Sequence, residues 1–140
     1  MSGEIVSAGG HKELQHGPQA QNAEPGPFNS RQLARLDEAL TLSSRETGLT
    51  FSVYVGEFRN PTRAHAEALF EKLSDDAVLV AVSPGQRTLH IVTGAVSAQR
   101  LPNRACALAA LAMRASFANG DLTGGIVTGL RMLADSAGNR

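Results

Sequence analysis

An unbroken apolar run at Val78–Val82 is followed, after a Pro-Gly pair, by a second run rich in β-branched residues at Thr88–Val92. An apolar run bounded by turn residues is typical of a strand that is buried on both faces. Two such runs on either side of Pro84-Gly85 predict a β-hairpin. We therefore expect residues 78–94 to form the centre of a β-sheet.

A strand is also predicted at Thr50–Gly56, as the first of the chain, because apolar and polar positions alternate strictly there. Asn60-Pro61 then predicts a helix start, with Asn60 as the N-cap and Pro61 in the first turn. This helix extends to Ser74, and its buried face comprises Ala66, Leu69, Phe70 and Leu73. Strand, helix and strand in succession predict a parallel pair, and the hairpin adds an antiparallel strand. The predicted fold class is α/β, with a small mixed β-sheet (a βαβ unit plus a β-hairpin) sandwiched by helices.

The first helix is predicted at Ser30–Thr47. Asn29 and Gln32 have the spacing of a capping box, and Phe28 is placed to pack against Leu33 as a hydrophobic staple. Gly48 stands where a C-terminal glycine is expected.

Two further helices are predicted after Pro102. The first presents a broad face of small and apolar residues to the sheet: Ala105, Leu108, Ala109, Leu111, Ala112 and Ala115. Asn119-Gly120 ends it, and Asp121 caps the last helix, whose apolar positions are Ile126, Leu130 and Leu133. Gly125 and Gly129 lie four residues apart on that helix, which favours close helix packing over a backbone that faces a ligand.

The chain divides into three parts. Residues 1–27 are rich in glycine and proline and lack apolar periodicity, so we expect a disordered N-terminal tail. Residues 28–136 form one α/β domain, and residues 137–140 form a short C-terminal tail. A length of 140 residues is enough for one domain with a core.

Composition and charge exclude several classes of function. The 13 basic and 13 acidic side chains cancel, which argues against nucleic-acid binding. A single cysteine, Cys106, excludes an internal disulfide and fits a reducing compartment. Its place on a small-residue helical stripe favours packing over a nucleophilic role. No stretch has the roughly 18 apolar residues of a membrane span, and the N-terminus lacks the pattern of a signal peptide. We therefore expect a soluble, cytoplasmic protein.

Polar residues that can bind a ligand fall at the ends of the predicted elements: Gln86, Arg87, Gly94, Asn103 and Asp121. Clefts in α/β sheets form outside the strand ends, and helix N-termini attract anions. The sequence leaves open whether these ends share one side of the sheet. Asp121 is the one carboxylate in this set, so it is the candidate ligand for calcium or magnesium. His90 is expected to be a hydrogen-bonded or edge-exposed side chain rather than a ligand.

The order of elements and several motifs resemble the TPM domain family, named after its thylakoid-lumen, photosystem-repair and nematode receptor-associated members. The resemblance covers Phe28 to Ala134. It rests on the Thr47-Gly48 pair, the Val78–Val82 strand, the Ile91-Val92-Thr93-Gly94 ending, Leu101-Pro102-Asn103 and Phe117-Ala-Asn-Gly-Asp-Leu-Thr-Gly-Gly125. The short chain without an anchor most resembles an actinobacterial branch of unknown function.

The resemblance implies an α/β sandwich. It also implies calcium binding or weak acid-phosphatase activity as in some members, or an accessory or assembly role as in others. The chain departs from the family pattern at two positions. Gly85-Gln86 precedes Arg87 where an acidic residue is common, and Asn103 stands where Asp is common, whereas Asp121 is retained. The acidic site is therefore depleted.

Two functions from different classes follow. The preferred one is a non-catalytic binding or accessory module for a protein partner or a small ligand. The alternative is an acid-phosphatase-like enzyme that depends on calcium or magnesium, with Asp121 on the metal, Arg87 on the phosphate and Asn103 as a neutral ligand. The oligomeric state stays open.

Overall fold

Four strands form one mixed sheet in the order β1-β2-β3-β4. The computed structural model describes residues 4–7 and 27–139 of the chain. The strands are β1 (Glu4–Ser7), β2 (Thr50–Val55), β3 (Ala77–Ser83) and β4 (Thr88–Thr93). β2 and β3 are parallel, and the two outer pairs are antiparallel. The mixed α/β architecture and the β3–β4 hairpin are thus confirmed, but the hairpin does not lie at the centre of the sheet, because β4 is an edge strand.

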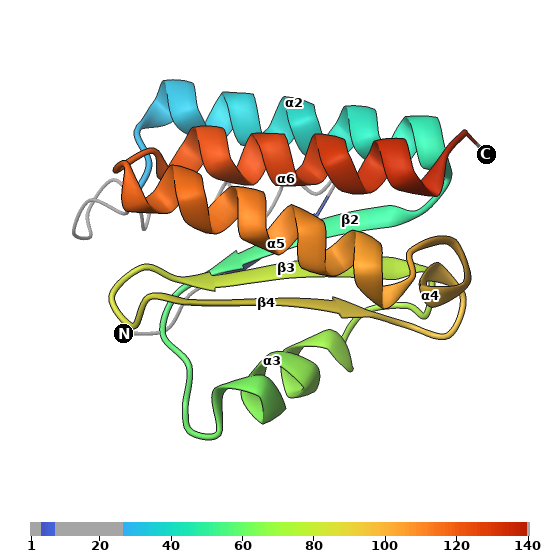
Figure 1. Cartoon of the computed structure of the whole chain (residues 1–140), viewed down its shortest axis with the longest axis horizontal. Coiled ribbons are helices and arrows are strands. Elements are labelled where there is room, and N and C mark those ends of the chain that lie inside the picture. The colour runs from blue at the N-terminus through green and yellow to red at the C-terminus, as the bar shows by residue number, and fades with distance from the viewer. Residues whose placement is uncertain (1–3, 8–26, 140) are drawn as a thin grey trace.

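Helices cover both faces of the sheet (Figure 1). Three long helices lie on one face: α2 (Ser30–Thr47), α5 (Asn103–Ala118) and α6 (Leu122–Ala137). The shorter α3 (Thr62–Phe70) lies on the other face, and the single turn α4 (Ser97–Arg100) precedes α5. All seven residues of β3 are buried between these layers.

The core is divided in two by the alternation of side chains along the strands. The larger cluster lies under the three long helices and contains Phe51, Val53, Val78, Val80, Val82 and Leu89 from the sheet. The smaller cluster lies under α3 and contains Tyr54, Phe58, Ala66, Leu79, Ala81 and Val92. The strand pattern therefore predicted which side chains share a face.

The first long helix has the predicted bounds and caps. Asn29 accepts a hydrogen bond from the Gln32 amide at 2.8 Å, and the Gln32 side chain accepts one from the Asn29 amide at 2.9 Å. Gly48 ends the helix with φ +81°, a conformation that glycine adopts without steric cost.

The N-terminal prediction is wrong for Glu4–Ser7. These residues form β1, which pairs with β2 in the register Ile5↔Tyr54, so Thr50–Val55 is the second strand in chain order. Main-chain hydrogen bonds to the edge of β2 stabilise this strand, and they need no apolar periodicity in the sequence. Residues 1–3 and 8–26 of the predicted tail lie outside the described residues.

The start and end of α3 also differ from the prediction. Pro61 is the N-cap, so the helix begins at Thr62, and it ends at Phe70 instead of Ser74. The predicted buried face is nevertheless confirmed, because Ala66 is buried and the other three residues pack against the smaller cluster.

The predicted buried face of α5 is confirmed only in part, because the helix is rotated about its axis relative to the prediction. Ala109 is buried as predicted, but Leu108 and Leu111 are 50% and 65% exposed, and Met113, outside the predicted face, is buried. Glycines on α6 explain this rotation: Gly125 is in close contact with Phe117, and Gly129 with Met113. These contacts confirm that the two glycines serve close helix packing.

No helix in the described ranges combines the length and the apolar composition that crossing a membrane requires.

We expect Val80→Ala to lower the free energy of unfolding by about 1–3 kcal/mol, because Val80 is fully buried at the centre of β3 and its truncation removes apolar contacts and leaves a cavity. Val96→Ala is the matched control, since Val96 is 42% exposed and should tolerate the same change. Chemical denaturation measures both variants. Equal midpoints for the two would contradict a core centred on β3.

Candidate functional site

A cleft of about 560 Å³ lies where the β3–β4 turn meets the α5–α6 turn, at the left end of the sheet in Figure 1. Its lining comes from three segments: the hairpin, the last turns of α5 and the start of α6. The residues are Val82, Ser83, Pro84, Arg87, Thr88, Leu89, Arg114, Phe117, Ala118, Gly120 and Leu122. A smaller groove of about 250 Å³ lies between α2 and α6, and its charged lining residues are Arg35, Arg131 and the carboxylate Glu38.

The larger cleft combines apolar walls with an excess of positive charge. Arg87 and Arg114 are its charged residues, and no carboxylate lines it. Both arginines are exposed, and neither guanidinium forms an ion pair with any residue in the described part of the chain. Two free guanidinium groups beside apolar surface favour a ligand that is anionic at one end and apolar at the other.

Arg87 has an unusual backbone conformation. Its φ is +53°, in the left-handed region that favours glycine, and its amide donates to the Pro84 carbonyl at 3.2 Å to close the turn. A non-glycine residue there costs on the order of 1 kcal/mol. Arg87 in this conformation is one of the residues that line the cleft.

The Asp121 carboxylate, by contrast, serves as a helix cap. Its Oδ1 accepts a hydrogen bond from the Gly124 amide at 2.9 Å. A Cβ atom at Gly124 would collide with this carboxylate, which explains why glycine occupies the position. Gly120 and Leu122 line the cleft on either side of Asp121, but the carboxylate itself is not part of the lining.

Gln86, another candidate ligand residue, clamps the hairpin to the loop before α3. Its Oε1 accepts from the Phe58 amide and the Ser83 hydroxyl, both at 2.7 Å, and its Nε2 donates to the Phe58 carbonyl at 3.0 Å. The side chain thus pairs with the Phe58 backbone as a neighbouring strand would. We therefore assign Gln86 a structural role.

Gly94 and Asn103 lie at the opposite end of the sheet. A Cβ atom at Gly94 would lie 2.5 Å from the Asp75 carbonyl oxygen, so this glycine allows a close backbone approach. Asn103 is the first residue of α5, a helix of 16 residues, and is therefore roughly 24 Å from the end that lines the cleft. The structure does not bring Asn103 together with Arg87 and Asp121, because α5 runs the length of the sheet between them.

A cluster of aromatic and histidine rings under the sheet was not predicted. The Phe58 ring centroid lies 5.6 Å from that of Tyr54, 5.8 Å from His65 and 5.4 Å from His90. The His90 Nε2 lies 2.9 Å from the Thr62 hydroxyl, so His90 is hydrogen-bonded as expected. Burial, reinforced by the charges of Arg63 and Arg114, lowers the pKa of His90. No local motif in the sequence signals this cluster, because its members come from β2, α3, β4 and the loop before α3.

The remaining candidates for chemistry are weak. Burial raises the pKa of the Cys106 thiol, which disfavours the reactive thiolate. Within residues 4–7 and 27–139, no three side chains of the His, Cys, Asp or Glu type are grouped to hold a metal ion.

Comparisons with known proteins give one family and one fold. A family model described as a domain of unknown function (DUF5130) matches residues 2–134. Two uncharacterized proteins of Mycobacterium tuberculosis, MT2543 from strain CDC 1551 and Rv2468c from strain H37Rv, are each 35% identical over an alignment of 119 residues, and each match covers 79% of this chain and 71% of theirs.

Two solved structures share the fold. The N-terminal domain of a protein from P. gingivalis has a TM-score of 0.70 at 16% identity, over 81% of this chain and 78% of that one. The BA42 protein from the psychrophilic bacterium Bizionia argentinensis has the same TM-score and identity, over 83% of this chain and 85% of that one. None of these matches carries the TPM name, so the TPM resemblance stays a prediction.

We expect Gln86→Ala to lower the free energy of unfolding by about 1–3 kcal/mol, because it leaves the Phe58 amide and carbonyl without their partner. Gln99→Ala is the control, since Gln99 is an exposed helical residue. Urea denaturation compares the two variants. If both variants have the same free energy of unfolding as the wild type, the Gln86 hydrogen bonds contribute nothing to stability, and Gln86 is again a candidate ligand residue.

We expect Asp121→Ala to cost about 1 kcal/mol of stability and Asp121→Asn to retain most of it, because an amide oxygen can also accept from the Gly124 amide. Thermal denaturation tests the cap. A calcium and magnesium titration followed by amide NMR tests the alternative role on the same two variants. Saturable shifts around Asp121 that disappear in Asp121→Asn would show a metal ligand instead of a cap alone.

Proposed function

The chain belongs to the family described as a domain of unknown function (DUF5130), and we propose that it is a non-catalytic binding module whose cleft receives an anionic group joined to an apolar one. The observation that carries this proposal is that Arg87 and Arg114 form no ion pair with any residue in the described part of the chain. They lie beside apolar walls in a cleft whose lining contains no carboxylate.

The two parts of the cleft recognise different parts of a ligand. Arginine binds carboxylate and phosphate oxygens through paired hydrogen bonds. Leu89, Phe117 and Leu122 supply apolar surface beside the guanidiniums, and its burial by a ligand contributes about 25 cal/mol per Å². Specificity for an anionic group with an apolar neighbour follows from this combination.

The same lining supports binding without catalysis. Its hydroxyl groups belong to Ser83 and Thr88, and neither is paired with a base: the Ser83 hydroxyl donates to Gln86, and the Thr88 hydroxyl donates to the Gln86 carbonyl at 2.9 Å. An activated nucleophile needs an adjacent base that takes its proton. The lining therefore offers recognition groups and no nucleophile–base pair.

The conformation of Arg87 also supports a binding role. Backbone strain of this kind is concentrated at functional sites, where the side chain it positions is needed. Arg87 makes no ion pair in the described part of the chain that would explain its position structurally. A ligand anion would supply the missing partner.

The phosphatase-like alternative has less support. Its three residues do not converge, because Asn103 lies at the far end of α5, and the Asp121 carboxylate is engaged in capping α6. We retain the TPM relationship and a cytoplasmic location as proposals. The former rests on the order of the elements and on the Phe117–Gly125 stretch, and the latter rests on the single cysteine.

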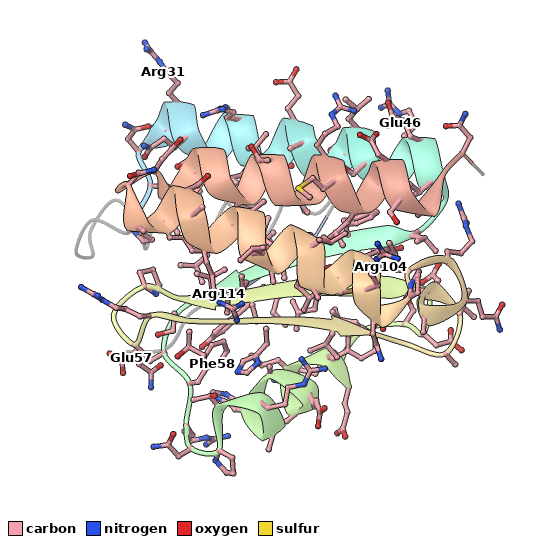
Figure 2. The ribbon with its side chains drawn as sticks, in the orientation of Figure 1. Arg31, Glu46, Glu57, Phe58, Arg104 and Arg114 are labelled. Carbon is pink, nitrogen blue, oxygen red and sulfur yellow. The ribbon has the colours of Figure 1, made fainter. Side chains whose placement is uncertain are left out.

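We expect hexanoate to shift the amide NMR signals of Arg87, Gly120 and Leu122, whereas hexanamide, which has the same apolar tail without the charge, shifts them less. Arg114→Ala should weaken hexanoate binding on the order of three- to tenfold, the size expected for a partly exposed charge-assisted contact. Arg31→Ala is the matched control, because Arg31 is an exposed helical arginine that points away from the sheet on α2 (Figure 2). Equal shifts with both compounds, or no shift with either, would contradict the proposal.

A further inference from the structure

The outer edge of β4 is an unpaired strand edge. In the sheet order β4 stands at the end and pairs with β3 alone. No other strand in the described part of the chain lies against its outer side. Such an edge presents main-chain donors and acceptors that an incoming strand can use.

The hydrogen-bond pattern identifies which backbone groups face outward. The Val82 carbonyl accepts from the Gly56 amide at 3.0 Å, so Val82 faces β2. Successive residues of a strand direct their backbone groups to opposite sides, and therefore Ala81 faces β4 and its partner His90 faces β3. By the same alternation, the groups of Leu89, Ile91 and Thr93 face outward.

An independent contact agrees with this assignment. The Ile91 carbonyl accepts a hydrogen bond from the Arg63 guanidinium on α3 at 3.2 Å, which is possible only on the outer side of β4. The outward amides of Leu89, Ile91 and Thr93 have no hydrogen-bond partner among the described residues. Three donors at alternate positions are thus available.

Positive charge flanks the open edge. Arg114 extends from α5 over β4 (Figure 2), and Arg63 reaches the edge from α3. Arg63 already has a carboxylate partner, Glu67, at 3.1 Å, whereas Arg114 has none in the described ranges. Arg87 adds a second unpaired guanidinium in the cleft, which the first residues of β4 also line. The unpaired charge therefore lies on the α5 side of the edge.

We infer that the β4 edge binds an extended acidic peptide segment of a partner protein as a fifth strand, with its carboxylates toward Arg114 and Arg87. This inference rests on the proposed function, because the cleft at the start of β4 holds one of the carboxylates. Main-chain hydrogen bonds to Leu89, Ile91 and Thr93 supply general affinity, and the two arginines select acidic side chains on one face of the peptide.

A second copy of this chain fits the edge less well. Pairing two β4 strands around a two-fold axis would bring Arg63 and Arg114 of both copies to the same interface, where like charges repel. The acidic peptide has the complementary charge.

The probe is a capped seven-residue peptide that alternates Glu and Val, and a Lys-Val peptide of the same length is the control. The hydrogen-exchange rate of each of the six backbone amides of β4 is measured by NMR. With peptide at ten times its Kd, exchange at Leu89, Ile91 and Thr93 should slow about tenfold, whereas Thr88, His90 and Val92, which already pair with β3, should not change. The Lys-Val peptide should leave all six amides unchanged.

Two further changes separate main-chain pairing from charge. Two Glu-Val peptides carry N-methyl groups on every second backbone amide, one on the amides that would face β4 and the other on the amides that would face away. Only the peptide with methyl groups facing β4 should lose binding. Arg114→Ala should weaken binding of the unmodified Glu-Val peptide on the order of three- to tenfold, and Arg31→Ala is the control.

The outcomes distinguish this inference from the proposed function. If the Glu-Val peptide shifts the amide NMR signals of Gly120 and Leu122 but does not slow hydrogen exchange at Leu89, Ile91 and Thr93, pairing as a fifth strand would be overturned. Binding in the cleft would still stand. If both peptides slow hydrogen exchange at those three amides and hexanoate causes no NMR shifts, the proposed ligand site in the cleft and the preference for acidic peptides would both be overturned. No binding of the Glu-Val peptide in a protein that does bind hexanoate would overturn the inference alone.

Discussion

The burial of β3 on both faces is the constraint on which the rest of the structure depends. All seven of its residues are inaccessible, so helices must cover the sheet above and below, and strands must satisfy its backbone groups on either side. β2 and β4 do this, so β4 is the last strand on one side of β3, whereas β1 follows β2 on the other side. β1 covers the edge at β2, and the edge at β4 stays open within the described residues. The open edge is thus a consequence of where the core lies.

Close packing of α5 on α6 decides how the site is presented. Gly125 and Gly129 leave room for Phe117 and Met113, and this contact fixes the rotation of α5 about its axis. The rotation places Arg114 over β4 and turns Leu108 and Leu111 outward. The stretch that carries the TPM resemblance, Phe117–Gly125, is therefore explained by packing and capping. Gly124, Gly125 and Asp121 hold two helices together, and Phe117 and Leu122 of the same stretch also line the cleft.

The cleft and the β4 edge form one continuous surface with a single electrostatic character. Leu89 belongs to both, and Arg87 and Arg114, which form no ion pair with any described residue, line the cleft beside it. An overall neutral chain conceals this local excess, because compensating acidic residues lie elsewhere. The proposed recognition of an anionic, extended segment rests on this local arrangement of charge and main-chain groups.

The sequence by itself determined the strands β2, β3 and β4, the first helix with both caps, the parallel and antiparallel pairings, and the cap at Asp121. Each of these depends on local alternation, turn residues or short-range hydrogen bonds, which are visible along the chain. It also placed Arg87 at a turn. Only the tertiary structure decided that Gly94 and Asn103 lie far from Arg87, that Gln86 clamps Phe58, and that Arg114 belongs to the cleft. The rotation of α5, the pairing of β1 and the open edge of β4 were likewise decided there, because they depend on contacts between residues far apart in the chain, and local pattern carries no information about those distances.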